Sequence, residues 1–198
     1  CFFHPSKTFH YFEPNPKMFR WIEENVRLLG LKGVKGYEEA MGASEGEGIF
    51  HVDESEPLQS SLVELPPDHR GTRATVRTTT LDRFLEKTPM TGPCIVKVDV
   101  ENAEHLFVEG GTRSLHTVPY LILELLGPAR GAKVMDLLID RFGFHCYYIN
   151  RFTLEHMARE DERYSEGEYN FLFCRERPKQ LADRLRGTEF TVSSGGWI

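Results

Sequence analysis

Apolar stretches rich in β-branched and aromatic residues alternate along the chain with amphipathic stretches. This alternation predicts an α/β fold with a largely parallel sheet. Strands are expected at residues 8–13, 36–43, 49–52, 60–63, 75–80, 94–100, 120–125, 144–149 and 169–174. Helices are expected at residues 16–29, 81–87, 103–115, 132–142 and 175–186. The remaining stretches are interpreted as turns or loops (45–48, 66–71, 159–168) and as a tail (187–198).

Two of the expected helices carry capping signals in the sequence. Asn15 stands directly before Pro16, and these residue types are favoured at the N-cap and at the first helical position. Apolar residues at three-to-four spacing follow until Gly30, which suits a helix end. Thr80 can cap the helix that begins at residue 81 in the same way. The first strand, capped turn and helix together predict half of a βαβ unit.

The stretch 94–104 begins as a buried strand and ends in acidic residues. Lys97, Asp99 and Glu101 interrupt its apolar residues at period two, so we expect all three on one face. Ionisable side chains are seldom left unpaired in a covered strand. The strand is therefore expected to leave the core here and to open on a crevice at its carboxyl end. A strand whose last charges are simply solvated is the alternative.

Acids occupy the same position on other strands. Glu13 ends the first strand and Glu124 stands near the end of the strand at 120–125. In open α/β sheets, ligands bind in the crevice beyond the carboxyl ends of the strands. Together with Asp99, these residues mark the place of a site without indicating its chemistry.

Composition narrows the class of protein. The chain has 198 residues, 40% hydrophobic and 27% charged, which is typical of one globular domain with its own core. Its net charge of -6 and the lack of a long basic run disfavour nucleic acid as a partner. No apolar run approaches the ~20 residues of a membrane span. Four cysteines without CxxC spacing indicate reduced thiols, so a cytoplasmic location is expected.

Several short motifs occur in a characteristic order. Residues 12–16 read FEPNP, 39–42 EAMG, 80–85 TLDRFL, 96–104 VKVDVENAE and 119–124 PYLILE. In order and spacing, from about residue 9 to 174, they resemble the FkbM-type S-adenosylmethionine-dependent methyltransferases. The resemblance implies a Rossmann-like class I methyltransferase sheet with helices on both faces, in a single domain over residues 1–198. It also implies methyl transfer from S-adenosylmethionine to a hydroxyl group of a small molecule, glycan or lipid.

The resemblance assigns roles by position. At the cofactor, Glu13 would hold the ribose hydroxyls, since a carboxylate accepts two hydrogen bonds from a vicinal diol. The implied cofactor-binding residues are Glu13, Asn15, Glu39, Ala40, Met41 and Asp99, with residues 39–41 along the adenine. The implied catalytic residues at the methyl-transfer end are Lys97, Asp99, Glu101 and Glu124.

Each catalytic candidate keeps a simpler alternative. Asp99 is the first choice as the base that removes the acceptor's proton, and the alternatives are orientation of the cofactor or pairing with Lys97. Lys97 is either that structural partner or a substrate contact. Glu101 is interpreted mainly as a first-turn acid favoured by the helix dipole, with a polar contact as the alternative. Glu124 is either a substrate contact or a solvated strand end.

A metal site, a nicotinamide-dependent enzyme and a non-catalytic module are three alternative interpretations of the sequence. His105 follows Asp99, Glu101 and Glu104, but their convergence is unsupported, so no metal site is expected. A nicotinamide-dependent enzyme is disfavoured because no GxGxxG follows any strand. A non-catalytic module with a methyltransferase-like fold stays open.

The sequence departs from the family pattern in two places. Asn102 stands where the family usually has glycine, and asparagine tolerates positive φ better than most residues. The family's first strand and its glycine-rich turn do not precede the FEPNP motif, and the chain begins at Cys1. We therefore expect a fragment with a gap in the sheet and an incomplete cofactor site, and a degenerate family member is the alternative. The acceptor and the oligomeric state are left open.

Overall fold

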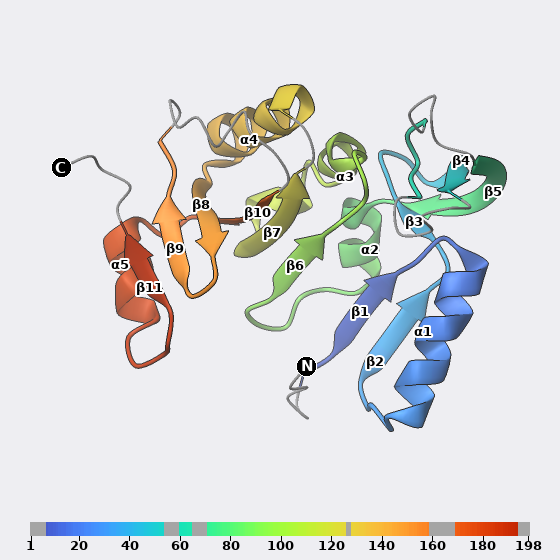
Figure 1. Cartoon of the computed structure of the whole chain (residues 1–198), viewed down its shortest axis with the longest axis horizontal. Helices are drawn as coiled ribbons and strands as arrows, with labels where there is room; N and C mark the ends of the chain where they lie inside the picture. Colours follow the sequence, from blue (N-terminus) through green and yellow to red (C-terminus); the bar gives the residue numbers. More distant parts are fainter. Residues whose placement is uncertain (1–6, 54–59, 65–70, 126–127, 159–168, 194–198) are drawn as a thin grey trace.

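Strands and helices alternate along the chain, as the sequence predicted (Figure 1). The computed structural model describes residues 7–53, 60–64, 71–125, 128–158 and 169–193. The strands are Phe9–Phe12 (β1), Val34–Tyr37 (β2), Ala40–Met41 (β3), Gly46–Asp53 (β4), Gly71–Thr79 (β5), Ile95–Val98 (β6), Tyr120–Leu125 (β7), His145–Asn150 (β8), Thr153–His156 (β9), Tyr169–Cys174 (β10) and Thr191–Ser193 (β11). The helices are Pro16–Leu28 (α1), Leu81–Lys87 (α2), Glu104–Gly110 (α3), Pro128–Phe142 (α4) and Pro178–Arg184 (α5), with a short 3-10 helix at Ser114–His116 (η2).

The largest sheet has six strands in the order β11-β9-β8-β10-β7-β6. β6 pairs with β7 and β9 with β11 in parallel, whereas β10 runs antiparallel to both β7 and β8. The expectation of a largely parallel sheet is therefore wrong for this part of the fold. β8 and β9 are antiparallel as well, in a hairpin that needs only a short turn rather than a crossover helix. The sequence missed β9, and β11 lies within the expected tail.

Helices cover both faces of the six-stranded sheet, as expected. On β7, Leu121, Leu123 and Leu125 are buried against one core, which includes residues of α3 and α4. Tyr120 and Ile122 point to the opposite face and pack in a second core. This core includes Leu181 of α5 and Leu185, which directly follows α5. The strand alternates between the two cores because successive side chains of a strand point to opposite faces.

Two smaller sheets complete the fold. β1 and β2 pair in parallel and carry α1, while β3, β5 and β4 form a three-stranded sheet that we call the small sheet. The expected turn at residues 45–48 is wrong, because β4 starts at Gly46 and pairs along β5 as far as Asp53. Glycine fits inside this strand for a steric reason. A Cβ atom on Gly48 would lie 2.8 Å from the Cγ2 atom of Thr78.

The predicted helix caps are confirmed. The side-chain Oδ1 of Asn15 accepts hydrogen bonds from the N–H groups of Lys17 (3.0 Å) and Met18 (3.4 Å). The hydroxyl of Thr80 accepts the N–H of Arg83 at 3.0 Å. Because these contacts lie within one turn of sequence, the starts of α1 and α2 could be predicted from the local residue pattern.

The helix expected at residues 103–115 is shorter than predicted. It ends at Gly110, and the 3-10 helix η2 follows after a break. Gly110 lies directly against the backbone of Gly42, the residue after β3, where a Cβ atom would come within 2.0 Å of the Gly42 carbonyl oxygen. The glycine that allows this close approach also weakens helix continuation.

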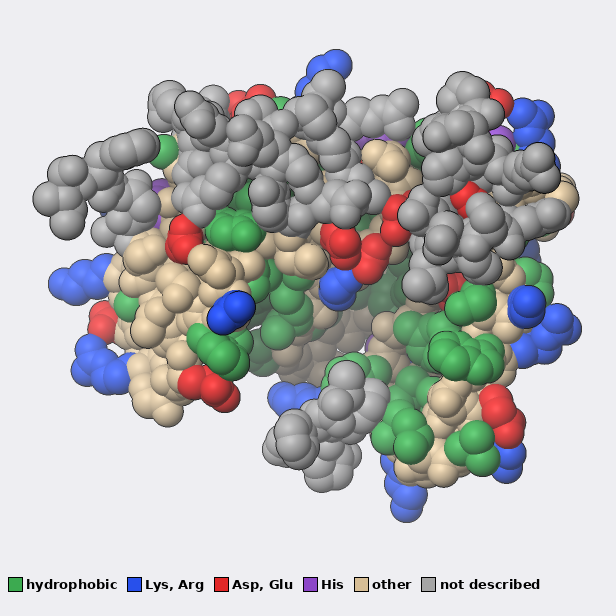
Figure 2. Space-filling view, viewed as in Figure 1, with side chains coloured by type: hydrophobic (Ala, Val, Ile, Leu, Met, Phe, Trp, Pro, Cys, Tyr) green, Lys and Arg blue, Asp and Glu red, His purple; other side chains and the backbone are tan. Residues whose placement is uncertain are grey.

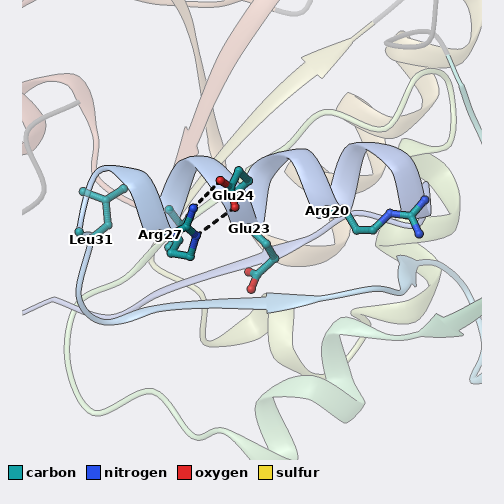
Figure 3. A pocket seen from close by; sticks show the side chains of 7 residues that line it. Arg20, Glu23, Glu24, Arg27 and Leu31 are labelled. Carbon is teal, nitrogen blue, oxygen red and sulfur yellow. Dashed lines mark hydrogen bonds and ion pairs between the residues drawn. The ribbon is translucent and has the colours of Figure 1, made fainter.

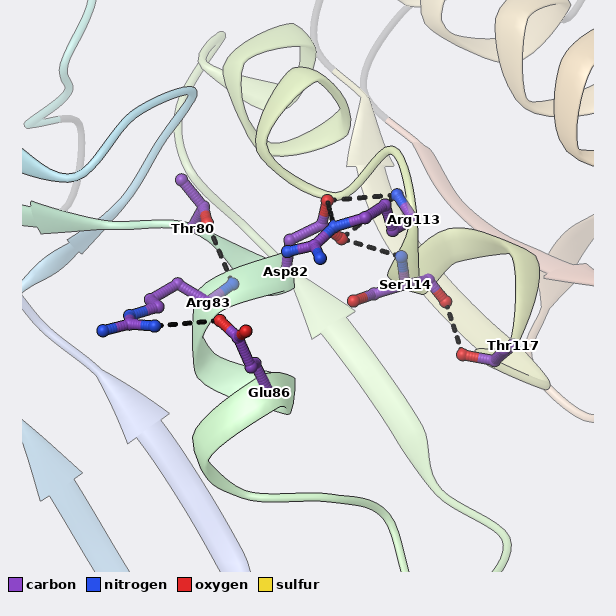
Figure 4. Close-up of polar contacts among 7 residues, drawn as sticks. All are labelled: Thr80, Asp82, Arg83, Glu86, Arg113, Ser114 and Thr117. Atoms are coloured by element: carbon purple, nitrogen blue, oxygen red, sulfur yellow. Dashed lines mark hydrogen bonds and ion pairs between the residues drawn. The ribbon is translucent and has the colours of Figure 1, made fainter.

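Asp82 joins the start of α2 to η2 (Figure 4). Its carboxylate accepts hydrogen bonds from the N–H of Ser114 at 2.7 Å and from the N–H of Arg113 at 3.1 and 3.2 Å. Burial would raise the pKa of Asp82, but these donors outweigh burial, so its pKa lies below the ordinary value. The aspartate of the TLDRFL motif therefore has a structural role in this fold.

Replacement of this aspartate should lower stability. We expect Asp82→Asn to lower the free energy of unfolding by about 1–3 kcal/mol, because the N–H groups of Arg113 and Ser114 lose a charged acceptor. Since the folded-state pKa of Asp82 is depressed, its contribution is present above the unfolded-state pKa and is lost as the pH falls through the folded-state value. The difference between wild type and variant should therefore shrink in acid, and urea unfolding at several pH values measures it.

Asp183→Asn is the matched control for this substitution. Asp183 pairs with Arg186 on an exposed helix face, so its replacement should cost no more than about 0.5 kcal/mol. Equal losses in the two variants would show that the contacts of Asp82 with Arg113 and Ser114 do not stabilise the fold.

Candidate functional site

The predicted acids lie at the carboxyl ends of their strands. Glu13 directly follows β1, Asp99 directly follows β6, and Glu124 is the last residue but one of β7. β1 pairs with β2 and β6 pairs with β7 in parallel, and the arrows of all four strands point the same way in Figure 1. The sequence therefore placed these three carboxylates correctly along the strands.

Lys97, Asp99 and Glu124 form one ion-pair cluster. The Nζ atom of Lys97 lies 2.7 Å from Oδ2 of Asp99 and 3.8 Å from Oε2 of Glu124. Figure 2 shows acidic and basic side chains gathered near the carboxyl ends of β6 and β7. The side chains of Lys97 and Asp99 are about half exposed, so the pair adds at most about 1 kcal/mol to stability. Its main effect is geometric, since one ammonium group holds two carboxylates at the sheet edge.

The turn at residues 99–103 has an unusual backbone. Glu101 and Asn102 both have left-handed conformations, with φ of 48° and 69°. Asn102 thus tolerates positive φ, as expected for the residue that replaces the family's glycine. The interpretation of Glu101 as a first-turn acid is wrong, because α3 begins only at Glu104. Glu104 occupies the first turn, is 3% exposed, and accepts the N–H of Asn102 at 3.1 Å.

Ser61 contacts this turn, and the sequence did not predict this contact. It is 3% exposed, and its hydroxyl donates to the carbonyl oxygen of Glu101 at 2.6 Å. The carbonyl oxygen of Val100 lies at 3.3 Å, and the N–H of Val63 donates to the same hydroxyl at 3.1 Å. About forty positions separate Ser61 from the turn. No spacing in the sequence signals a contact between segments so far apart.

Glu13 and Asn15 lie together after β1. The carboxylate of Glu13 accepts the N–H of Asn15 at 2.7 Å, and the N–H of Glu13 donates to the Tyr37 carbonyl at 3.0 Å. Burial raises the pKa of Glu13, and the hydrogen bond from Asn15 opposes this only in part. The side-chain oxygen of Asn15 caps α1, so its contact with a cofactor stays a prediction, as does that of Glu13.

Glu39 directly precedes β3, and Ala40 and Met41 form β3 of the small sheet. Glu39 pairs with Arg77 of β5 at 3.6 Å, and its side chain is 26% exposed. Ala40 is buried in the core of the small sheet, and Met41 packs against the main core. Their predicted place along an adenine ring stays a prediction. Of the three, Met41 is half-buried and offers apolar surface, Glu39 offers a partly exposed carboxylate, and Ala40 is buried.

The part of the chain that the structure describes shows neither a metal cluster nor a membrane-spanning helix. Within the described residues, no group of three or more His, Cys, Asp or Glu side chains is placed to hold a metal ion, and His105 lies on α3. Nor does this part of the chain contain a helix long and apolar enough to cross a membrane.

An open hollow of about 580 Å³ runs along α1 (Figure 3). Its lining comes from α1 and the residues just after it, and within it Arg27 pairs with Glu24 at 2.6 Å. Ligand sites usually combine groups from several elements. The hollow is therefore a weaker candidate than the edge formed by β6 and β7.

Comparison with known proteins gives the family. The model of the methyltransferase FkbM domain matches residues 2–149, which is more than half of the chain. A crystal structure of methyltransferase FkbM from Methylobacillus flagellatus KT is similar with a TM-score of 0.51 and 10% sequence identity. The similarity covers 84% of this chain and 36% of that chain, and at this identity it shows a shared fold alone. No curated protein sequence matches the chain. On the family match, the chain belongs to the FkbM methyltransferases.

Proposed function

We propose that this chain is the larger part of an S-adenosylmethionine-dependent O-methyltransferase domain that acts on a hydroxyl group of a small molecule, glycan or lipid. The observation that carries the proposal is the Lys97, Asp99 and Glu124 cluster at the carboxyl edge of β6 and β7, in a chain of the FkbM family. Ligands of α/β folds bind at that edge. Under this proposal the three sheets are parts of one Rossmann-like methyltransferase sheet.

The residues after β1 suit the ribose of the cofactor. Glu13 offers carboxylate oxygens to two hydroxyl groups, and its bond from the N–H of Asn15 fixes the orientation of the carboxylate. Met41 supplies apolar surface for the adenine, Glu39 supplies a polar group beside it, and the buried Ala40 holds β3 in place below. When bound, S-adenosylmethionine supplies a methyl group on a positively charged sulfur, to which a carboxylate-lined edge is attractive.

At the acceptor, the chain's own residues position a hydroxyl group and take its proton. Asp99 is the proposed base, since its carboxylate lies at the sheet edge and can accept the proton as the oxygen attacks. Lys97 orients Asp99 and Glu124 through its two contacts. Glu124 and Glu101 are proposed as further polar contacts to the acceptor. Holding the acceptor in line with the methyl group is the larger part of the catalysis.

We further propose that one more parallel strand pairs between β6 and β1 in the working enzyme. β6 is an edge strand of the six-stranded sheet, and β1 is an edge strand of the two-stranded sheet. In Figure 1, β1 and β2 follow β6 across the molecule, and all three arrows point the same way. Figure 2 shows a hollow with hydrophobic side chains between these parts. Ile95 of β6 is 67% exposed and Phe9 of β1 is 40% exposed. Exposed apolar residues on two strand edges support such a pairing.

A non-catalytic binding module is the second candidate. It is favoured by one observation, because the glycine-rich turn of the family pattern (DxGANxG) does not occur in residues 1–198. The same fold would then bind a partner rather than a cofactor. For either function the buried free thiol of Cys174 supports a reducing compartment such as the cytoplasm.

Binding of S-adenosylmethionine should depend on the length of the polypeptide. In calorimetric titrations of S-adenosylmethionine, a polypeptide extended upstream through any encoded strand should bind the cofactor. The 198-residue chain should bind at least tenfold more weakly, because part of the cofactor's contacts would be missing. If both polypeptides are folded and neither binds, the enzyme proposal is wrong and the binding-module proposal gains support.

Glu13→Gln should weaken binding of S-adenosylmethionine by about 10- to 100-fold, the size expected for hydrogen bonds to a charged group. The wild-type affinity should also fall as the pH drops, with a midpoint above the ~4.3 of an ordinary glutamate, because burial raises the pKa of Glu13 and the ionised form binds. Titrations from pH 4 to 8 test both statements. Glu189→Gln, at an exposed position, is the control. If Glu13→Gln binds S-adenosylmethionine as tightly as wild type does, Glu13 is not part of the cofactor site.

Asp99→Asn should lower kcat by about 10²- to 10⁴-fold, the usual contribution of a general base, and leave the affinity for S-adenosylmethionine within threefold. The measurement is formation of S-adenosylhomocysteine with an acceptor found by screening hydroxyl compounds. Asp136→Asn, on an exposed face of α4, should keep wild-type turnover. Wild-type kcat in Asp99→Asn would exclude Asp99 as the base.

A further inference from the structure

The turn that follows β6 is held in a conformation that its residues disfavour. Glu101 and Asn102 are consecutive left-handed residues, and Glu101 is not of the type that adopts this region readily. Such a conformation persists only where its surroundings hold it. Asp99 lies two residues before Glu101, so the direction of its carboxylate depends on how this turn is held.

Two polar groups hold the turn from outside its own backbone. The hydroxyl of Ser61 donates to the carbonyl oxygen of Glu101 at 2.6 Å, and the carboxylate of Glu104 accepts the N–H of Asn102 at 3.1 Å. Ser61 and Glu104 are each 3% exposed, so water does not readily replace either partner. Glu104 belongs to the next helix, whereas Ser61 comes from a distant part of the chain.

Ser61 is itself anchored to the small sheet. Its backbone exchanges two hydrogen bonds with His51 of β4, at 2.7 and 2.9 Å, and β4 is paired along β5. At its other end the small sheet touches α3, where the carbonyl of Gly42 lies against Gly110. The small sheet therefore contacts both the turn and the helix that follows it.

We propose that Ser61 is a positioning residue of the candidate site, whose hydroxyl holds the left-handed turn and thereby aims Asp99 at the edge of β6 and β7. Ser61 acts through the backbone of Glu101. The catalytic consequence rests on the proposed function, whereas the effect on the turn does not. The small sheet thus contributes to the site, because its pairing with Ser61 places the Ser61 hydroxyl against a turn about forty positions later in the chain.

The first test measures the turn directly. Ser61→Ala should speed hydrogen exchange of the amide of Asn102 by about tenfold, the size expected for loss of one hydrogen bond, and should shift the carboxyl-carbon NMR signal of Asp99. Thr188→Ala is the matched control, because the Thr188 hydroxyl also donates to a backbone carbonyl, of Leu185, and accepts an N–H two residues ahead. It lies after α5, and its replacement should change neither signal.

Rescue separates a positioning role from a loss of folding. Ser61→Thr keeps the hydroxyl and should restore the Asp99 signal. Adding Glu101→Gly to Ser61→Ala should also restore it, because glycine adopts the positive φ of this position without strain, whereas glutamate does not. Unchanged exchange and an unchanged Asp99 signal in folded Ser61→Ala overturn the proposal. If Ser61→Ala does not fold, failure of both rescuing changes to restore the Asp99 signal overturns it too.

The effect of Ser61 on catalysis is tested by a separate activity measurement. In the extended polypeptide, Ser61→Ala should lower kcat at least tenfold while the KM for S-adenosylmethionine stays within threefold. Equal kcat in the variant and wild type would contradict the aiming of Asp99. If the wild type transfers no methyl group to any hydroxyl compound, the proposed function fails, and the exchange and NMR measurements alone decide whether Ser61 holds the turn.

Discussion

The parallel pairing of β6 with β7 sets the geometry on which the candidate site depends. Its register places Lys97 opposite Ile122 and Val98 opposite Leu123. The next positions on the two strands are then Asp99 and Glu124, two acids side by side at the end of the ladder. Like charges in this arrangement repel each other. Lys97 precedes Asp99 by two residues on the same face, and its ammonium group lies within 4 Å of both carboxylates, which offsets the repulsion.

The same pairing explains why the small sheet matters for the site. β6 ends at Val98, so the chain must turn within a few residues before α3 begins at Glu104. That turn uses two left-handed residues, and its polar backbone groups are satisfied by Glu104 from one side and Ser61 from the other. A buried carbonyl without a partner is costly. The position of the small sheet and the position of the acids are thus coupled through one buried hydroxyl.

Membership in the FkbM methyltransferases supplies the class of chemistry, methyl transfer, that the acids at the strand ends do not indicate by themselves. The arrangement of strands adds a feature that the family match does not address, because β1 and β2 form a sheet apart from the six-stranded one. Contact between the two parts runs through aromatic side chains, with Phe84 of α2 packed on rings from β1 and β2. Ring packing of this kind places β1 without backbone pairing to β6, and it leaves Phe9 and Ile95 exposed.

The sequence by itself determined the local elements. The bounds of α1, α2, β7 and β10, the caps at Asn15 and Thr80, and the acids at the strand ends all follow from patterns within a few residues. Only the tertiary structure decided the position of β10 between β7 and β8, the pairing of β11 with β9, and the contact of Ser61 with Glu101. These features join segments that are far apart in the chain. Periodicity and capping report what neighbouring residues favour, whereas strand order and a buried hydroxyl's partner are set by the packing of the whole core.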